Sequence, residues 1–226
     1  MIVLSATNIT KEYGTDVILR DVSFHLNEGD RVGLIGKNGE GKTTLLKILT
    51  GELAATAGES YISKEKTVGY LKQTDHFDSR NTVIAEVEQI FTEVRKLEAD
   101  MTALSETIAE KSARREDVDK LLAEYDRMTL RFEQLDGYSY KSEIVGILSS
   151  MAFTEEFYDK KISMLSGGER TRLALACLLL KKPDILFLDE PTNHLDIGTL
   201  KWLEQFLRGY KGTILVVSHD RYFLDR

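Results

Sequence analysis

The sequence contains a single cysteine, two prolines and no long hydrophobic run. One cysteine, Cys177, excludes an internal disulfide framework. It lies among leucines and alanines, which is typical of a small buried apolar side chain. The longest strongly apolar stretch, residues 173–180, is far shorter than the roughly 20 residues that span a bilayer. We therefore expect no transmembrane segment in this chain.

The sequence also has no excess of basic residues. The 226 residues carry 30 lysines and arginines against 37 acids, a formal net charge of −7. This balance argues against a generally basic surface and against indiscriminate nucleic-acid binding. Residues 1–7 lack the basic start and apolar core of a signal peptide, so we expect a cytoplasmic location.

The two ends of the sequence have an α/β pattern. Short strands are expected at 2–4, 17–19 and 22–26, with turn signals at 13–16 and 27–30. A strand at 31–35 leads into a glycine-rich loop and a helix at 43–49. After residue 170, the pattern predicts a helix at 171–180, a strand at 185–188, a helix at 199–207 and a strand at 213–217. The continuous apolar run at 185–188 is typical of a buried parallel sheet.

The middle of the sequence has a heptad pattern. Apolar residues alternate in steps of three and four at Val87, Ile90, Val94, Leu97, Met101, Leu104 and Ile108, and again at Val118, Leu121, Tyr125, Met128, Phe132 and Leu135. A polar link, residues 111–117, separates the two runs. This pattern predicts an antiparallel coiled-coil hairpin, with a helix of about 25 residues, or about 37 Å.

A phosphate-binding loop is the clearest motif. It matches G-x-x-x-x-G-K-[ST] after a strand and before a helix, in the residues Gly36, Lys37, Asn38, Gly39, Glu40, Gly41, Lys42 and Thr43. The glycines let backbone N–H groups converge on phosphate oxygens at a helix N-terminus. We expect Lys42 to reach the β- and γ-phosphates and Thr43 to supply a hydroxyl to Mg²⁺. Thr44 completes the predicted binding set.

Two carboxylates, Asp189 and Glu190, end the apolar strand at 185–188. Ligands of α/β sheets bind at the carboxyl ends of the strands. We expect Asp189 to hold Mg²⁺, mostly through water, and Glu190 to orient and deprotonate the attacking water. Such a pair alone is an ordinary solvated turn, but the phosphate loop favours the catalytic interpretation.

Ser166 and Glu169 have the spacing of a capping box at the start of a helix. Gly167 and Gly168 lie inside this cap, although glycine is a poor helix former. Close approach of a phosphate to exposed N–H groups would explain them. On spacing alone, a simple helix cap remains the alternative.

Together these motifs resemble the ATP-binding-cassette (ABC) family over essentially the whole chain. The resemblance implies an α/β phosphate-loop NTPase core, with an N-terminal antiparallel β subdomain and an inserted helical hairpin or arm. It also implies that Tyr13 stacks on adenine, that Gln73 contacts Mg²⁺ and the attacking water, and that His219 touches the γ-phosphate. Catalysis would then involve Glu190, His219 and Gln73, with Mg²⁺ bound by Thr43, Gln73 and Asp189.

The family sandwiches ATP between the phosphate loop of one cassette and the signature of another. Ser166, Gly167 and Gly168 would therefore act on ATP held by a second ABC domain, in the same full-length chain or in a homodimer. One copy alone would be a weak Mg-dependent ATPase.

Within the family, the sequence resembles the F subfamily, whose soluble two-cassette proteins act on ribosomes. Residues 190–196 and 218–225 have the form of that subfamily, and the hairpin lies where its arm is inserted. The expected boundaries are a core of residues 1–81 and 137–226 and an arm of residues 82–136, with a second cassette beyond Arg226. The alternative is the ATPase subunit of a membrane ABC transporter.

The resemblance implies that the arm contacts transfer RNA and ribosomal RNA. Its acidic net charge means that the whole arm cannot bind nucleic acid. Residues 82–135 hold 8 lysines and arginines and 13 acids, a net charge of −5. The local basic cluster is at the tip, at Lys111, Arg114 and Arg115. Phosphate contacts need such side chains, yet three charges at a hairpin tip are more often a solvated turn than an RNA contact.

Overall fold

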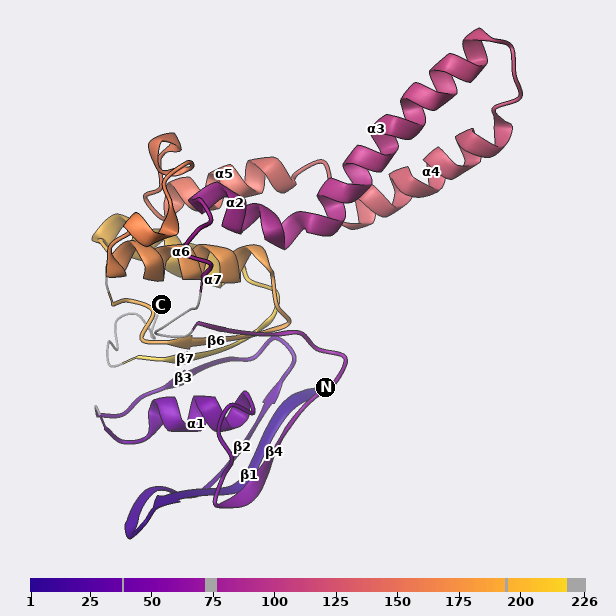
Figure 1. Ribbon diagram of the computed structural model, residues 1–226. Helices are drawn as coiled ribbons and strands as arrows, with labels where there is room; N and C mark the ends of the chain where they lie inside the picture. Colours follow the sequence, from indigo (N-terminus) through magenta and orange to yellow (C-terminus); the bar gives the residue numbers. More distant parts are fainter. Residues whose placement is uncertain (38, 72–76, 194, 219–226) are drawn as a thin grey trace. The chain divides into compact units, whose positions relative to one another are not determined.

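A computed structural model describes residues 1–37, 39–71, 77–193 and 195–218 (Figure 1). The chain divides into two compact units, Met1–His76 with Leu165–Arg226, and Phe77–Met164. In its described residues the first unit holds two β-sheets and three helices, and the second unit is helical. Within the described ranges, no helix is long and apolar enough to cross a membrane.

An antiparallel sheet begins the first unit. Its strands are β1 (Ile2–Tyr13), β2 (Asp16–Asn27) and β4 (Ala57–Ile62), in the order β2-β1-β4. The two separate strands predicted at 17–19 and 22–26 are one strand, β2. Asp21 has a positive φ of 53° between them, and its N–H donates to the Thr10 hydroxyl at 3.1 Å. This bond to β1 satisfies the Asp21 N–H, so β2 continues past the irregular residue.

A parallel sheet forms the centre of the same unit. It consists of β3 (Arg31–Leu34), β5 (Val68–Leu71), β6 (Ile185–Asp189) and β7 (Thr213–Val217), in the order β3-β7-β6-β5. Every residue of β6 and β7 is buried. Both faces of a parallel sheet are covered by other elements, which explains the unbroken apolar runs.

Alternate residues of the central strands face different layers. Ile185, Phe187, Leu215 and Val217 share one hydrophobic core with the antiparallel sheet and α1 (Lys42–Leu49). The other face carries α6 (Gly167–Leu180) and α7 (Ile197–Gly209), as Figure 1 shows. In α6, all eight residues from 173 to 180 are buried, because this helix is apolar on every side.

The second unit contains the predicted helical hairpin. Its long helices are α3 (Thr92–Ala113) and α4 (Asp119–Gln134), which pack side by side (Figure 1). The heptad positions of both runs are buried or half-buried, whereas most residues between them are exposed. The remaining elements are α2 (Val83–Glu88), α5 (Tyr140–Ser150) and the 3₁₀ turns η1 (Gln89–Phe91), η2 (Glu155–Phe157) and η3 (Ile162–Met164).

The first heptad run differs from the expected single helix, because η1 interrupts it between α2 and α3. Phe91 lies outside the heptad seam but is buried, and its ring packs on that of Tyr140 with centroids 5.4 Å apart. Phe91 is four residues after Val87 and three before Val94, so it lies on the same side of the helical segment as both. All three side chains are buried.

Gly137 provides a test of packing at the base of the hairpin. A Cβ atom there would lie 2.5–2.6 Å from three ring atoms of the buried Phe132. We predict that Gly137→Ala lowers the free energy of unfolding by about 1–3 kcal/mol, the usual cost of overpacking. Urea unfolding measures this change.

Gly146 is the matched control, because it lies inside α5 with nothing within 4 Å of an added Cβ. Gly146→Ala should stabilise by about 0.5–1 kcal/mol through helix propensity. Equal effects of the two substitutions would contradict the packing described for Gly137.

Candidate nucleotide site

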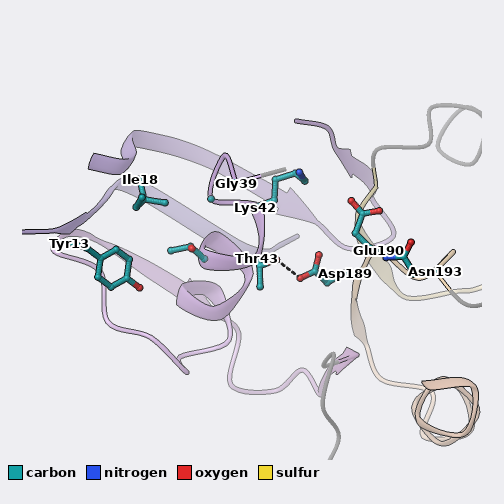
Figure 2. A pocket seen from close by; sticks show the side chains of 10 residues that line it. Tyr13, Ile18, Gly39, Lys42, Thr43, Asp189, Glu190 and Asn193 are labelled. Atoms are coloured by element: carbon teal, nitrogen blue, oxygen red, sulfur yellow. Dashed lines mark hydrogen bonds between the residues drawn. The ribbon is translucent and has the colours of Figure 1, made fainter. Parts of the chain in front are cut away.

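The predicted phosphate loop and the two acids meet at one cavity of about 530 Å³ in the first unit. The cavity is lined by Tyr13, Ile18, Gly39, Gly41, Lys42, Thr43, Thr44, Asp189, Glu190 and Asn193. Figure 2 shows Tyr13 and Glu190 at opposite ends, with Thr43 and Asp189 between them. The cavity is thus long enough to present different chemical groups to different parts of an elongated ligand.

Strand register explains why residues so distant in sequence meet here. Val217 of β7 pairs with Leu34 of β3 on one side and with Asp189 of β6 on the other. The phosphate loop therefore leaves the sheet level with the two acids. The N–H of Glu190 donates to the Val217 carbonyl at 2.8 Å, which extends this alignment one residue beyond β6.

The phosphate loop ends in a tight approach to β2. Gly39 and Gly41 have positive φ angles of 87° and 84°. A Cβ atom on Gly41 would lie 2.8 Å from Cγ2 of Ile18, so glycine is required there. Gly41 is also the N-cap of α1, and among the described residues no side chain caps this helix. Its first N–H groups can therefore bind an anion.

The ammonium group of Lys42 is held inside the loop. Its Nζ donates to the carbonyls of Gly36 at 2.7 Å and Lys37 at 2.8 Å. The N–H of Lys37 donates to the Glu40 carboxylate at 2.8 Å. These contacts close the loop on itself and keep a positive charge beside the N-terminus of α1. Positive charge at this place favours phosphate over neutral ligands.

Thr43 and Asp189 form the contact between the loop and the acids. The Thr43 hydroxyl donates to Oδ2 of Asp189 at 2.6 Å (Figure 2). Asp189 is only 7% exposed. Burial raises the pKa of its carboxyl, and the Thr43 hydrogen bond opposes this rise only in part. A buried carboxylate beside a hydroxyl is a fitting pair of oxygen ligands for Mg²⁺, whose charge would offset the burial.

Glu190, the residue after Asp189, lies in a turn with a strained backbone. It is half-buried and has a φ of 50°, in the left-handed region that disfavours side chains with a Cβ. The N–H of Asn193 donates to the Glu190 carbonyl at 3.2 Å and closes the turn. Such strain is concentrated at functional sites. The turn directs the Glu190 side chain toward the cavity rather than along the strand (Figure 2).

The predicted capping box is present at the start of α6. The Glu169 N–H donates to the Ser166 hydroxyl at 3.3 Å, and the Ser166 N–H donates to the Glu169 carboxylate at 2.6 Å. A Cβ atom on Gly167 would meet nothing within 4 Å, so packing does not require glycine there. Neither Ser166, Gly167 nor Gly168 lines the cavity that holds Lys42.

Three predicted site residues, Asn38, Gln73 and His219, lie outside the described residues, so their roles stay predictions. Two lining residues were not predicted for the site. Ile18 was expected only as part of a strand, and Asn193 was considered only as a mark of a subfamily. No local pattern in the sequence places either residue at the cavity, because the fold brings them there.

Comparison with known proteins identifies several relatives. The family described as ABC transporter matches residues 19–193. The tylosin resistance ATP-binding protein TlrC of Streptomyces fradiae is 41% identical over 99% of this chain and 40% of its own. The energy-dependent translational throttle protein EttA of Haemophilus influenzae is 40% identical over 92% of this chain and 36% of its own length. ABC transporter F family member 2 of Arabidopsis thaliana is 36% identical over 97% and 32%. The chain thus spans about a third to two fifths of these relatives.

Among solved structures, the fold resembles a dimeric structure of MJ0796, a bacterial ABC transporter cassette. The TM-score is 0.66 at 22% identity, and the alignment covers 98% of this chain and 90% of the other. At this identity the comparison supports the fold alone.

The buried charge of Asp189 leads to a stability prediction. Because its pKa is raised in the folded chain, the protein without ligand loses stability as pH rises through that pKa. We predict that Asp189→Asn is more stable than the parent at about pH 7. The difference in the free energy of unfolding should shrink as pH falls toward about 4, the ordinary range of aspartate.

Asp196 is the control of opposite sign. It accepts hydrogen bonds from the N–H and the hydroxyl of Thr199, which lower its pKa. Asp196→Asn should therefore be less stable than the parent near neutral pH, and this difference should also shrink in acid. Urea unfolding across the pH range checks both variants, and destabilisation by Asp189→Asn at pH 7 would contradict the account.

Proposed function

Because the chain belongs to the ABC transporter family and is an ATP-binding-cassette ATPase domain most like those of the F subfamily, we propose that it binds and hydrolyses Mg-ATP in the cavity described above. The observation that carries this proposal is the Thr43–Asp189 pair. It joins the N-terminus of α1, which suits phosphate, to a buried carboxylate that suits a divalent cation.

Each part of the nucleotide has a candidate place along the cavity. Tyr13, a residue that is 52% exposed, would stack on the base beside Ile18. The phosphates would lie against the loop and the start of α1, with Lys42 neutralising charge on the β- and γ-phosphates. Thr43 and Asp189 would hold Mg²⁺ together with Gln73.

Bound Mg²⁺ would neutralise charge on the phosphate oxygens and so assist transfer to water. At the far end of the cavity, the Glu190 carboxylate would orient the attacking water and accept its proton. Gln73 and His219 would contact the water and the γ-phosphate, respectively. The chain thus contributes positioning and electrostatics, which are the main sources of rate in phosphoryl transfer.

The signature residues would complete a second site rather than this one. Ser166, Gly167 and Gly168 lie at an accessible helix N-terminus away from the Lys42 cavity. We propose that they act on the γ-phosphate of ATP held by a second ABC domain, as in a two-cassette chain or a homodimer. A single copy would then hydrolyse ATP weakly.

For the whole protein we propose a cytoplasmic two-cassette ATPase that acts on the ribosome. EttA, a relative at 40% identity, is named as a translational throttle protein. Residues 82–136 would form the arm inserted in the helical part, and the hairpin of α3 and α4 supports this assignment. Lys111, Arg114 and Arg115 at its tip would supply contacts to transfer RNA or ribosomal RNA. The alternative function is the ATPase subunit of a membrane transporter.

The role of Glu190 is tested by Glu190→Gln, which keeps the shape of the side chain and removes the base. We predict ATP affinity close to that of the parent and a fall in phosphate release of at least about a hundredfold. Glu156→Gln, in η2 of the second unit, is the matched control and should leave turnover unchanged. Normal turnover by Glu190→Gln would rule out Glu190 as the base.

The ribosomal function is tested with the longest natural chain that contains this sequence, carrying Glu190→Gln. We predict that it sediments with ribosomes in the presence of ATP and remains in the supernatant without it. Reversing the charges of Lys111, Arg114 and Arg115 should weaken the association, because the tip is the basic part of an acidic hairpin. Recovery with a membrane-protein partner and no ribosomes would instead establish the transporter alternative.

A further inference from the structure

Lys11 lies over the ring of Tyr13. The two residues are two positions apart on β1, so their side chains share one side of the strand. The Nζ atom of Lys11 is 5.0 Å from the ring centroid, within the range of a cation–π interaction. Tyr13 lines the nucleotide cavity, whereas Lys11 does not. The lysine therefore covers the ring without entering the cavity.

The position of this ammonium group is fixed by the segment that follows α1. Nζ of Lys11 donates to the carbonyl of Ala54 at 2.9 Å. Two further bonds join the same parts of the chain: the Glu12 N–H donates to the Thr56 hydroxyl at 3.0 Å, and the Thr56 N–H donates to the Thr10 carbonyl at 2.8 Å. Lys11 is thus anchored on the loop that leads out of the phosphate-binding helix.

We propose that Lys11 is a positioning residue for the nucleotide base, holding the Tyr13 ring from one face so that the opposite face receives the base. This inference rests on the proposed function, in which Tyr13 stacks on the base of ATP. An exposed tyrosine ring loses rotational freedom when a ligand stacks on it, which weakens binding. Because Lys11 orders the ring before the ligand arrives, part of that cost is borne in the free protein.

The inference separates base binding from phosphate binding. Lys11 acts on Tyr13, at the end of the cavity away from Glu190 (Figure 2), and the loop charge comes from Lys42. Loss of Lys11 should therefore weaken binding of ligands that carry a base and leave ligands made only of phosphate unaffected. A residue that merely stabilised the segment after α1 would weaken both kinds.

The experiment measures the affinity of the chain for Mg-ATP and for Mg-tripolyphosphate by calorimetry. The variants are Lys11→Met, Lys11→Arg, Tyr13→Ala and the double variant Lys11→Met with Tyr13→Ala. Lys11→Met keeps an apolar stem but removes the charge and the donor. Lys11→Arg retains a cation that donates and stacks on aromatic rings. Thermal unfolding of each variant verifies that it is folded, and Lys11→Arg against the parent keeps the test informative if Lys11→Met does not fold.

We expect Lys11→Met to weaken ATP binding about threefold to tenfold, the range of an exposed cation–π contact with its ordering effect. Tripolyphosphate binding should be unchanged, Lys11→Arg should bind ATP like the parent, and Lys11→Met should have no further effect once Tyr13 is alanine. Equal weakening of both ligands, or failure of Lys11→Arg to bind ATP normally, would overturn the inference.

Failure of the inference differs from failure of the proposed function. If Tyr13→Ala weakens ATP binding and Lys11→Met does not, then Tyr13 stacks on the base without help from Lys11, and only the inference is overturned. If the parent chain binds neither ligand, then the nucleotide site itself is wrong. If Tyr13→Ala binds ATP like the parent, then both the stacking role and the inference are wrong.

Discussion

The pairing of β7 with β3 on one side and β6 on the other is the constraint on which the site depends. Because Val217 is level with both Leu34 and Asp189, the phosphate loop and the acidic turn leave the sheet at the same height. The 2.6 Å contact between Thr43 and Asp189 follows from that register. A shift of one residue in the β6–β7 pairing would turn the Asp189 side chain to the opposite face of the sheet, and a shift in the β3–β7 pairing would move the loop out of line with it.

The features that were predicted from sequence depend on residues that lie close together in the chain. The phosphate loop needs glycine where φ is positive, as at Gly41, so the spacing of its glycines can be recognised from the sequence alone. β6 and β7 are continuous apolar runs because both faces are covered, and their bounds differ from the predicted ones by at most one residue. The capping box at Ser166 depends only on residues within one helical turn. The heptad seam likewise predicted the buried positions of α3 and α4.

The features that sequence could not predict depend on contacts between distant segments. β2 continues through Asp21 because a hydroxyl from β1 takes its N–H, and the sequence around Asp21 indicates only a break. The ring of Phe91, in η1, packs on that of Tyr140, and the heptad pattern does not predict this contact. Ile18 lines the cavity because Gly41 approaches β2 closely. In each case the deciding partner is far away in the chain, and no single window of sequence contains both.

The central claim is that one divalent cation and one nucleoside triphosphate bind between the start of α1 and the end of β6. A crystal structure of the chain with Mg²⁺ and a non-hydrolysable ATP analogue tests it most directly. The account predicts phosphates at the N-terminus of α1, the base against Tyr13, and a metal ion to which both the Thr43 hydroxyl and the Asp189 carboxylate turn. Nucleotide bound elsewhere, or bound here with the Thr43–Asp189 hydrogen bond intact and no ion beside it, would contradict the account.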